Sequence, residues 1–490
     1  MQNLYKDTRK LDKACIAAYG LTEEVMMENA AASLESVIRK HFQTESCKRR
    51  ILILCGTGDN GADGYTLARR LRIDFDIIVF QCGKPKSALC KLQAERAEKC
   101  GTPFFDLNDF TLEFLANTGI VVDCIFGAGF KGDLSENLQI LLNDVNFYDC
   151  YKIACDIPTG LREDGTVADV VFHADLTLTM GAHKLSLFSD AAKDFVGKIE
   201  CAELGVSRRL FENSSNSRLK VAELLEESDM ILPHRKFNNV NKGSFGHSVI
   251  AVGEKRGAAI LAGSAALNFG AGLVTITDLE NKISPELFPC ELMISNAIPE
   301  KAKAIAFGMG LGREKEATQK YFDYLIEHKD TYCVIDADAC YSENLKAFLD
   351  ARCHRTVLTP HPKEFKAVLK TCGFGEYSIE ECVTNKVELI EKFCKTYPKS
   401  VLLVKGANPV IGCFDGYKMF IMVNPFGRPS LAKAGSGDVL SGMICALLAQ
   451  NYKAVDAAVS ASLAHALAAQ KAKCDYALTP TKLIEKFSEL

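Results

Sequence analysis

Short apolar runs alternate with segments of helical periodicity along most of the chain. In the first half, apolar runs of strand length occur at residues 51–55, 75–80, 120–126 and 151–157. The pattern resumes in the second half at residues 248–252, 273–277, 304–307 and 401–404, and two more predicted strands, at 334–339 and 357–362, end in polar residues. Strands that alternate with helices predict parallel sheets covered by helices on both faces. Before the first run, the periodicity predicts two helices.

The alternation breaks between residues 206 and 218. Residues 212–217 there read Glu-Asn-Ser-Ser-Asn-Ser, a composition typical of linkers. A chain of 490 residues is also too long for one ordinary hydrophobic core. We therefore predict two α/β domains, one over residues 1–215 and one over residues 216–490.

A helix whose N-terminus could bind an anion is predicted near the end of the chain. Residues 435–442 read Gly-Ser-Gly-Asp-Val-Leu-Ser-Gly, and apolar residues then recur at helical spacing. Glycines let backbone N–H groups approach a ligand, and a helix N-terminus attracts negative charge. Asp438 lies in the predicted first turn, where it is either a reactive carboxylate or only a cap.

Polar residues also follow the predicted strands of the first half. Residues 56–64 (Gly-Thr-Gly-Asp-Asn-Gly-Ala-Asp-Gly) follow the first strand, in neither dehydrogenase nor P-loop spacing. Asp123 and the loop 127–133 follow a later strand, and residues 156–160 follow the next. Ligands of open α/β sheets bind beyond the carboxyl ends of strands. These residues are candidates for a cation or sugar-like ligand, although each one taken alone is more often a turn former than a ligand.

The second half has the same arrangement. Predicted strands run into Gly308-Met-Gly-Leu-Gly, Asp336-Ala-Asp, Thr359-Pro-His-Pro and Lys405-Gly-Ala-Asn-Pro. Lys405 is placed to lie near phosphate. The helix expected at residues 258–269 is rich in small residues, which would let another element approach closely.

Composition narrows the class of protein. The net charge of −4 argues against a nucleic-acid surface, and 48% hydrophobic with 24% charged residues is typical of a globular protein. The first residues lack the apolar core of a signal peptide, and no apolar run reaches transmembrane length. The 20 cysteines form no CxxC pair. We expect a cytoplasmic protein without a membrane partner, whose thiols are mostly reduced core residues.

The motifs of both halves resemble one known arrangement. The first half resembles the YjeF N-terminal family of NAD(P)H-hydrate epimerases, in residues 27–30, 58–64, 123–127 and 156–160. The second half resembles the ADP-dependent NAD(P)H-hydrate dehydratases of the ribokinase-like superfamily, in residues 308–312, 336–339, 359–364, 405–407 and 435–442. The resemblance implies a Rossmann-like α/β/α sandwich followed by a ribokinase-like α/β domain. Asp59 and Ala62 depart from the family's usual first loop.

The resemblance also implies an activity. Hydration of NADH or NADPH gives two epimers that no longer carry hydride. The first half would interconvert the R and S forms, and the second would use ADP to dehydrate the S form, giving AMP and phosphate. NAD(P)H hydrate and ADP would be the small-molecule partners. Independently of the resemblance, the Ala-rich C-terminal helices could pack against a second subunit, so we expect a homo-oligomer. The alternative is a ribokinase-like small-molecule kinase fused to a non-catalytic YjeF-type binding domain.

For the epimerase half, the resemblance assigns Asp156 as the catalytic acid/base. It assigns K⁺ ligands to Asn60, Asp123 and Thr159, although Asp123 could instead be a strand-end cap. The substrate-binding residues carried over are Asp59, Asn60, Gly61, Ala62, Asp63, Gly127, Ala128, Gly129, Phe130, Lys131, Gly132, Asp133 and Asp156.

For the dehydratase half, the resemblance assigns Asp438 as the general base. Mg²⁺ is expected with ADP, without assigned protein ligands. The substrate-binding residues carried over are Ala258, Gly310, His361 and Asp438, and the nucleotide-binding residues are Lys405, Gly406, Ala407, Asn408, Pro409 and Gly437. His361, between two prolines, could instead only fix a turn.

Overall fold

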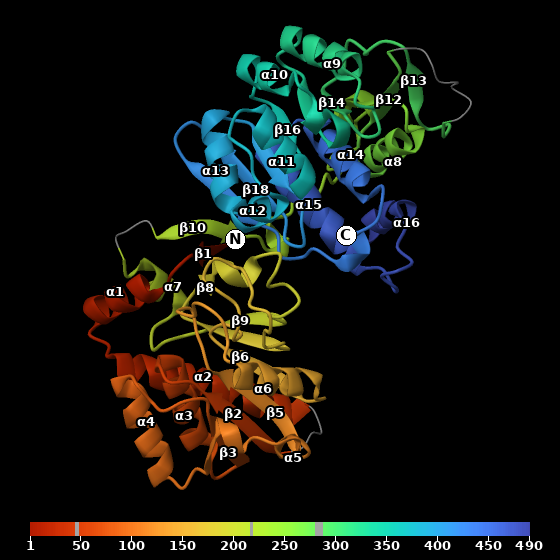
Figure 1. Ribbon diagram of the computed structural model, residues 1–490. Helices are drawn as coiled ribbons and strands as arrows, with labels where there is room; N and C mark the ends of the chain where they lie inside the picture. Colours follow the sequence, from red (N-terminus) through yellow and green to blue (C-terminus); the bar gives the residue numbers. More distant parts are fainter. Residues whose placement is uncertain (45–48, 216–218, 280–287) are drawn as a thin grey trace. The chain divides into compact units, whose positions relative to one another are not determined.

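The computed structural model describes residues 1–44, 49–215, 219–279 and 288–490. Its contacts divide the chain into two compact units, Asn3–Ala222 and Glu223–Leu490 with Met1–Gln2. They are called the N-terminal unit and the C-terminal unit below (Figure 1). The boundary predicted after residue 215 stays a prediction.

The N-terminal unit is built on a parallel sheet in the order β4-β3-β2-β5-β6-β7-β9. Its strands are β2 (Arg50–Cys55), β3 (Asp76–Gln81), β4 (Phe104–Asp106), β5 (Thr118–Cys124), β6 (Tyr151–Cys155), β7 (Leu176–Met180) and β9 (Lys198–Ala202). A short pair, β1 (Gln2–Tyr5) and β8 (His183–Lys184), lies apart from this sheet. The helices are α1 (Arg9–Tyr19), α2 (Glu23–Thr44), α3 (Asp59–Leu71), α4 (Ala88–Lys99), α5 (Leu112–Leu115), α6 (Glu136–Phe147) and α7 (Arg208–Asn213).

Alternating side chains of β2 show why this sheet has two covered faces. Ile51 and Ile53 belong to a core cluster with residues of α2, α3 and α4, whereas Leu52 and Leu54 belong to a second cluster with residues of α6. Successive side chains of a strand point to opposite faces, so a strand that is apolar throughout needs a helix layer on each side. The predicted α/β/α sandwich is therefore confirmed (Figure 1).

The C-terminal unit has a larger sheet in the order β13-β12-β11-β14-β15-β16-β17-β18-β19, followed by β10. Its strands are β10 (Lys220–Leu224), β11 (His247–Ala251), β12 (Leu273–Thr277), β13 (Met293–Ser295), β14 (Ala304–Phe307), β15 (Tyr332–Ile335), β16 (Thr356–Leu358), β17 (Val401–Val404), β18 (Val410–Phe414) and β19 (Met419–Val423). The pairs from β13 to β17 are parallel, and β17-β18-β19 is an antiparallel meander.

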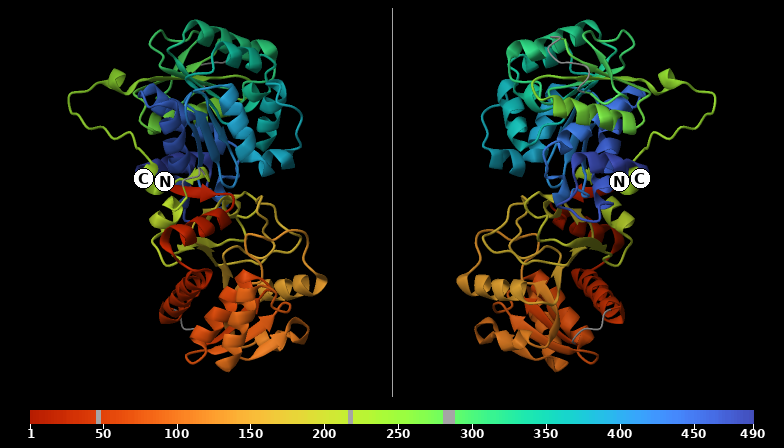
Figure 2. Two further views of the ribbon diagram at one scale, coloured as in Figure 1. Left: turned by 90° about the vertical axis from the view of Figure 1, so that its left-hand side faces the viewer. Right: turned by 90° about the vertical axis from the view of Figure 1, so that its right-hand side faces the viewer.

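Two groups of helices cover this sheet, which can be followed from two further sides in Figure 2. The helices are α8 (Arg256–Asn268), α9 (Lys315–Glu327), α10 (Leu345–Ala351), α11 (Pro362–Thr371), α12 (Ile379–Thr384), α13 (Lys386–Thr396), α14 (Ser436–Ala449), α15 (Ala454–Gln470) and α16 (Pro480–Glu485). Ala306 packs in the cluster of α8, α14 and α15. Its neighbour Phe307 instead contacts Tyr321 and Phe322 of α9.

The small residues of α8 do allow a close approach, as predicted. A Cβ on Gly442 of α14 would lie only 2.1 Å from the carbonyl oxygen of Ala262. The Ala-rich helices α14 and α15 are buried inside their own unit, with almost every side chain in one core cluster. They do not offer the free face on which the homo-oligomer prediction was based, and that prediction remains untested.

Three further expectations can be compared with the structure. The alternation was expected to break over residues 206–218, with a linker at 212–217, but residues 208–213 form α7, because Phe211 is buried in a small apolar cluster. Residues 216–218 lie outside the described part. Most described cysteines are buried and all of them are free thiols, as predicted. None of the described helices is long and apolar enough to cross a membrane.

Candidate active sites

The first candidate site lies at the carboxyl ends of β2, β5 and β6, which are neighbours in the sheet. Helix α3 begins at Asp59 just after β2, Asp123 lies near the end of β5, and Asp156 follows β6. The chain continues from β2 to β3 on one side, whereas β5 lies on the other. Such a change of direction opens a crevice at the strand ends, where α/β proteins bind ligands. The structure thus brings the three predicted strand ends together.

Asp123 is fully buried and tied to Thr159. Its carboxylate accepts hydrogen bonds from the Thr159 backbone N–H at 2.7 Å, the Thr159 hydroxyl at 2.8 Å and the Ile125 N–H at 3.0 Å. Burial raises the pKa of Asp123 to about 6, and the hydrogen bonds from Thr159 and Ile125 oppose that rise. These contacts join the ends of β5 and β6. They are compatible with Asp123 as a strand-end cap and equally with Asp123 as a cation ligand.

A potassium ion fits the donor atoms of this corner. The Asp123 carboxylate, the Thr159 hydroxyl and the Asn60 amide provide the oxygen atoms that a hard cation prefers. The Asn60 Nδ2 atom is buried without a hydrogen-bond partner in the structure. The assignment of the two amide atoms can be exchanged, and an oxygen in that place would gain a partner if a cation were bound.

Asp156 is held in a strained backbone conformation by a set of donors. Its φ angle is 70°, in the left-handed region that non-glycine residues rarely adopt. Its Oδ1 atom accepts from Lys184 Nζ at 2.5 Å and from the Met180 N–H at 3.1 Å. Its Oδ2 atom accepts from the Ala128 N–H at 3.3 Å. The carboxylate is therefore fixed against the loop 127–133, where the substrate residues were predicted.

Lys184 is a residue of this site that the sequence analysis missed. Its side chain is 2% exposed, and its ammonium group also donates to Thr179 Oγ1 and the Met180 carbonyl oxygen. A lysine within the mostly apolar stretch 176–188 was the available signal, because an unpaired ammonium group would not be buried there.

Two more carboxylates lie within electrostatic range of this pair. The pKa of Asp12 is raised to about 6, chiefly by burial, with Lys184 opposing the rise and Asp156 adding to it. The pKa of Asp63 is raised well above its ordinary value by burial and by the charges of Asp156 and Asp59. Asp63 was among the predicted substrate residues; Asp12 of α1 was not predicted.

The other predicted residues of this half differ in exposure. Ala62 is buried in the core, and so is the Phe130 side chain; only their backbone atoms could contact a ligand. Asp59, Gly129, Lys131, Gly132 and Asp133 are exposed, whereas Gly61 is buried and Gly127 and Ala128 are partly buried. A Cβ on Gly61 would lie 2.1 Å from the Gly56 carbonyl oxygen, so this position requires glycine.

The second candidate site lies at the carboxyl ends of β14 to β17. Asp336 follows β15 and is 1% exposed, and its Oδ1 atom lies 2.8 Å from Lys405 Nζ after β17. The same ammonium group lies 3.6 Å from Glu364 Oε2 of α11. Although burial works in the opposite direction, the charges of Asp336 and Glu364 raise the pKa of Lys405. A permanent positive charge is thus held where the strands end.

Helix α14 begins beside this lysine. Its N-cap, Gly435, has a φ angle of 91°, a conformation that favours glycine. A Cβ on Gly437 would lie 3.2 Å from Lys405 Nζ. The first N–H groups of a helix have no partner within the helix and attract anions. The predicted helix start is observed, with a lysine at the same place, and anion binding there stays a prediction.

Asp438, in the first turn of α14, does not cap the helix with its side chain. No hydrogen bond or ion pair of its carboxylate is present among the described residues. Burial and the charge of Asp336 raise its pKa to about 6, with Lys405 opposing the rise. A partly exposed carboxylate with such a pKa can take up a proton near neutral pH.

Asp336 also contacts α14 directly. Its Oδ2 atom accepts a hydrogen bond from Ser441 Oγ at 2.7 Å, and Ser441 Oγ lies 3.4 Å from Thr359 Oγ1. In the sequence, Asp336 and Ser441 stand out only as members of motifs. Their role became visible once the helix was seen to lie across the ends of β15 and β16.

Ala258 and Gly310, two predicted substrate residues, are neighbours. A Cβ on Gly310 would lie 3.2 Å from the Ala258 Cβ atom, and the Lys255 N–H donates to the Gly310 carbonyl oxygen at 2.9 Å. With a φ angle of 59° at Gly310, this loop and the start of α8 meet closely.

His361 has a clear structural role as N-cap of α11. Its Nδ1 atom accepts from the Lys363 N–H at 3.1 Å, while Glu364 accepts from the His361 backbone N–H at 2.8 Å. The His361 Nε2 atom lies 3.0 Å from Glu364 Oε1. This supports the turn-fixing reading, although the ring is still 45% exposed and could contact a ligand.

The predicted nucleotide loop connects β17 and β18. Gly406 and Ala407 are exposed, whereas the Asn408 side chain is buried and Pro409 is partly buried. A Cβ on Gly427 would lie 2.1 Å from the Ala407 carbonyl oxygen, so a second loop supports this one.

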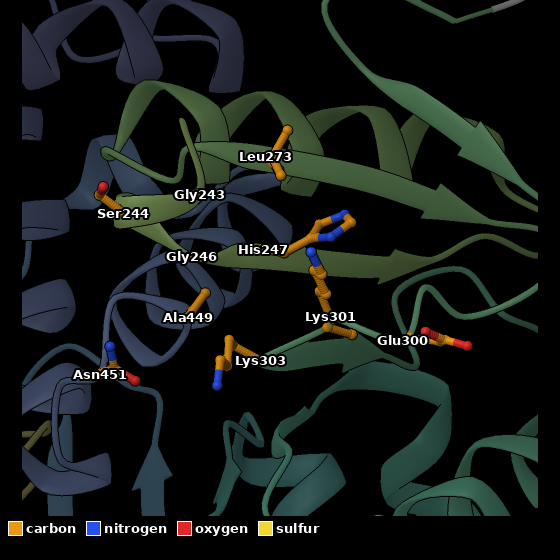
Figure 3. A pocket seen from close by; sticks show the side chains of 11 residues that line it. Gly243, Ser244, Gly246, His247, Leu273, Glu300, Lys301, Lys303, Ala449 and Asn451 are labelled. Atoms are coloured by element: carbon orange, nitrogen blue, oxygen red, sulfur yellow. The ribbon is translucent and has the colours of Figure 1, made fainter. Parts of the chain in front are cut away.

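A separate pocket of about 410 Å³ lies at the opposite end of the same sheet (Figure 3). It is lined by His247 and Leu273, the first residues of β11 and β12, and by Lys303, which precedes β14. Lys301 extends toward the His247 ring in Figure 3. None of the predicted site residues lines this pocket, because they lie at the carboxyl ends of the strands.

Comparisons with known proteins identify both halves. Residues 23–186 match the family model of the YjeF-related protein N-terminus, and residues 249–489 match that of NAD(P)H-hydrate dehydratase. Over 492 residues and the full length of both chains, the protein is 42% identical to the bifunctional NAD(P)H-hydrate repair enzyme Nnr of Helicobacter pylori. It is 32% identical to that of Moorella thermoacetica, with 94% of this chain and 91% of the relative covered.

A similarity to solved structures concerns the C-terminal unit. The ADP/ATP-dependent NAD(P)H-hydrate dehydratase of Bacillus subtilis, co-crystallised with ATP/Mg²⁺, is 25% identical, with a TM-score of 0.46, and covers 55% of this chain and 97% of its own. The matches to both halves favour repair over the alternative of a kinase fused to a binding domain. The chain belongs to the family of bifunctional NAD(P)H-hydrate repair enzymes, with an epimerase half of the YjeF type followed by an NAD(P)H-hydrate dehydratase half.

Proposed function

We propose that the C-terminal unit dehydrates the S form of NAD(P)H hydrate with ADP, at the start of α14. The carrying observation is the Asp438 carboxylate, which has a pKa of about 6 and lies in the first turn of a helix that begins beside Lys405. A base without a strong hydrogen-bond partner next to an anion-binding helix start is the arrangement that phosphoryl transfer to an alcohol requires.

Asp438 takes the proton from the substrate hydroxyl, and the hydroxyl oxygen attacks the terminal phosphoryl group of ADP. AMP leaves, and the bound substrate carries the phosphate on its ring. The carbon–oxygen bond then breaks, phosphate leaves with the bonding electrons, and loss of a ring proton restores the nicotinamide double bond. The amides at the start of α14 and Lys405 stabilise the charge on the transferred group.

The loop 405–409 would hold the nucleotide, since its exposed Gly406 and Ala407 directly follow Lys405. Ala258 and Gly310, together with His361, would contact the dinucleotide. Mg²⁺ bound with the nucleotide would neutralise phosphate charge. Among the described residues, no group of three or more His, Cys, Asp or Glu side chains could hold a metal ion, so the phosphates would provide most of its ligands.

In the N-terminal unit, Asp156 would act as acid and base while the hydroxyl on the nicotinamide ring departs and returns. Asn60, Asp123 and Thr159 would hold K⁺, which would supply a fixed positive charge near the substrate phosphates. The residues of the loops 59–63 and 127–133 would bind the substrate around Asp156, which contacts Ala128.

The test is a repair assay on the purified chain with NADH hydrate, ADP and Mg²⁺, following the absorbance of NADH. The unaltered protein should recover NADH from both epimers. Asp438→Asn should reduce the rate at least about a thousandfold while ADP still binds. An unaltered protein that recovers no NADH, or an Asp438→Asn variant that is fully active, would overturn the proposal.

A further inference from the structure

His465 is a buried imidazole that contacts the start of α14 from a neighbouring helix. It lies in α15, whose other buried side chains are mainly alanine, and is 8% exposed. Its Nε2 atom lies 3.0 Å from the carbonyl oxygen of Ser436 and 3.2 Å from Ser436 Oγ. Ser436 is the first residue of α14, next to Gly437 and Asp438.

The chemistry of this contact defines the state of the ring. Burial, with a smaller contribution from Lys405, lowers the pKa of His465 to about 4, so the imidazole is neutral at neutral pH. A neutral imidazole has a single N–H group, and a carbonyl oxygen can only accept. The 3.0 Å contact with the Ser436 carbonyl oxygen is a hydrogen bond only if the proton is on Nε2, and we assign this tautomer to His465.

The held carbonyl belongs to the same planar peptide unit as the Gly437 N–H. The carbonyl and the N–H of a peptide unit point in opposite directions. When the Ser436 carbonyl is held toward α15, the Gly437 N–H is therefore held toward the N-terminal end of α14. There a Cβ on Gly437 would lie 3.2 Å from Lys405 Nζ. Gly435 and Gly437 flank Ser436, and glycines leave a backbone free to adopt other conformations. A bond from outside the segment counters that freedom.

Because the His465 ring is neutral, it provides no electrostatic attraction for the transferred phosphoryl group. Its contribution is geometric, because an anion-binding amide is effective only if it already points at the position where charge develops. The Ala-rich helix α15 packs against α14 and provides a rigid support for the imidazole.

We propose that His465 is a positioning residue of the dehydratase site, whose Nε2–H anchors the Ser436 carbonyl and thereby orients the Gly437 amide toward the transferred phosphoryl group. This inference rests on the proposed function of the C-terminal unit. It adds to Asp438 and Lys405 a residue that does not touch the substrate.

The test compares three variants of the full chain in the repair assay. His465→Leu removes the donor at similar size and should lower kcat about 10- to 100-fold, with KM for NADH hydrate changed less than about threefold. His465→Gln keeps an N–H donor and should stay within about fivefold of the unaltered kcat. His328→Leu, at the exposed end of α9, is the matched control and should change neither constant.

The outcomes separate the possibilities. A folded His465→Leu variant with unaltered kcat would overturn the inference, and so would a His465→Gln variant that loses as much kcat as His465→Leu, since shape rather than the donor would then matter. An unaltered chain without dehydratase activity would instead contradict the proposed function.

If the variants do not fold, ¹⁵N NMR of histidine-labelled unaltered protein decides the matter. The inference expects His465 to remain the Nε2–H tautomer from pH 9 down to about 5. An Nδ1–H tautomer, or protonation within that range, would overturn it.

Discussion

Asp336 lies in an ion pair with Lys405 while its charge acts on the neighbouring Asp438. Burial and this charge together raise the pKa of Asp438 to about 6. Because a general base must be ionised, kcat/KM for dehydration should rise with pH through this value. Asp336→Asn removes the negative neighbour and leaves Lys405 to stabilise the Asp438 carboxylate.

In Asp336→Asn, the pKa of Asp438 should therefore fall, and the acid limb of the pH profile should move to lower pH. The measurement is kcat/KM for dehydration between pH 4.5 and 9. Asp330→Asn, a change at an exposed carboxylate, should leave the limb in place. An acid limb that stays or moves to higher pH in Asp336→Asn would show that the base is a different group.

Lys184 is the second residue whose charge can be tested. Its ion pair with Asp156 is buried on both sides, with 2% and 13% of the two side chains exposed. Removing one partner of such a pair leaves an unpaired buried charge and typically costs about 3–5 kcal/mol.

Lys184→Met should accordingly lower the temperature at which the N-terminal unit unfolds and abolish epimerisation, while the C-terminal unit still dehydrates the S form. Calorimetry and the repair assay measure the two effects. Lys198→Met, at a mostly exposed ion pair, should be close to neutral. If Lys184→Met were as stable as the unaltered protein, Asp156 would have to be uncharged in the folded state.

At the scale of elements, the contact between α14 and α8 depends on Gly442 of α14, which has no side chain. Alanine normally stabilises a helix relative to glycine by up to about 1 kcal/mol. At Gly442, however, the new Cβ would lie 2.1 Å from the Ala262 carbonyl oxygen. Relieving such a clash costs about 1–3 kcal/mol.

Gly442→Ala should thus destabilise the C-terminal unit and reduce dehydratase activity, because α14 carries Asp438. Gly257→Ala in the first turn of α8, where a Cβ would meet nothing within 4 Å, is the matched control and should be neutral or stabilising. Urea unfolding followed by far-UV circular dichroism compares the two. Equal stabilisation in both variants would mean that α14 and α8 can separate without cost.

The elements that the sequence predicted well are those with strong local patterns. The strands at 273–277 and 401–404 were predicted with the bounds that the structure shows, because each is a short apolar run ended by polar or glycine residues. The antiparallel strands β18 and β19 were missed, since their pairing depends on a neighbour in space and not on a helix between them.

The residues of the candidate sites were likewise found where a local sequence pattern marked them. Asp123, Asp156, Lys405 and Asp438 could be found because they stand at predicted strand or helix ends. Lys184 and His465 were missed, because each contacts a residue more than 25 positions away in the sequence. The apolar stretch around Lys184 was a signal of its burial, whereas the contact of His465 with Ser436 is visible only once the packing is known.

At the scale of the whole chain, the two candidate sites belong to two compact units, each with its own core. A product of one site can reach the other through solution, so the two activities need not reside in the same molecule. Two inactive variants can test this. Asp156→Asn should lack only epimerisation, and Asp438→Asn should lack only dehydration.

Asp156→Asn alone, given ADP and a mixture of epimers, should convert the S fraction quickly and then continue only at the slow rate of spontaneous epimerisation. Asp438→Asn alone should recover no NADH. An equal mixture of the two variants should recover all of the NADH. The Asp438→Asn molecules convert the R form into the S form, and the Asp156→Asn molecules then dehydrate the S form. Recovery in the mixture that stopped at the S fraction would mean that the epimer must pass between two intact sites of one chain. The independence that separate cores imply would then be wrong.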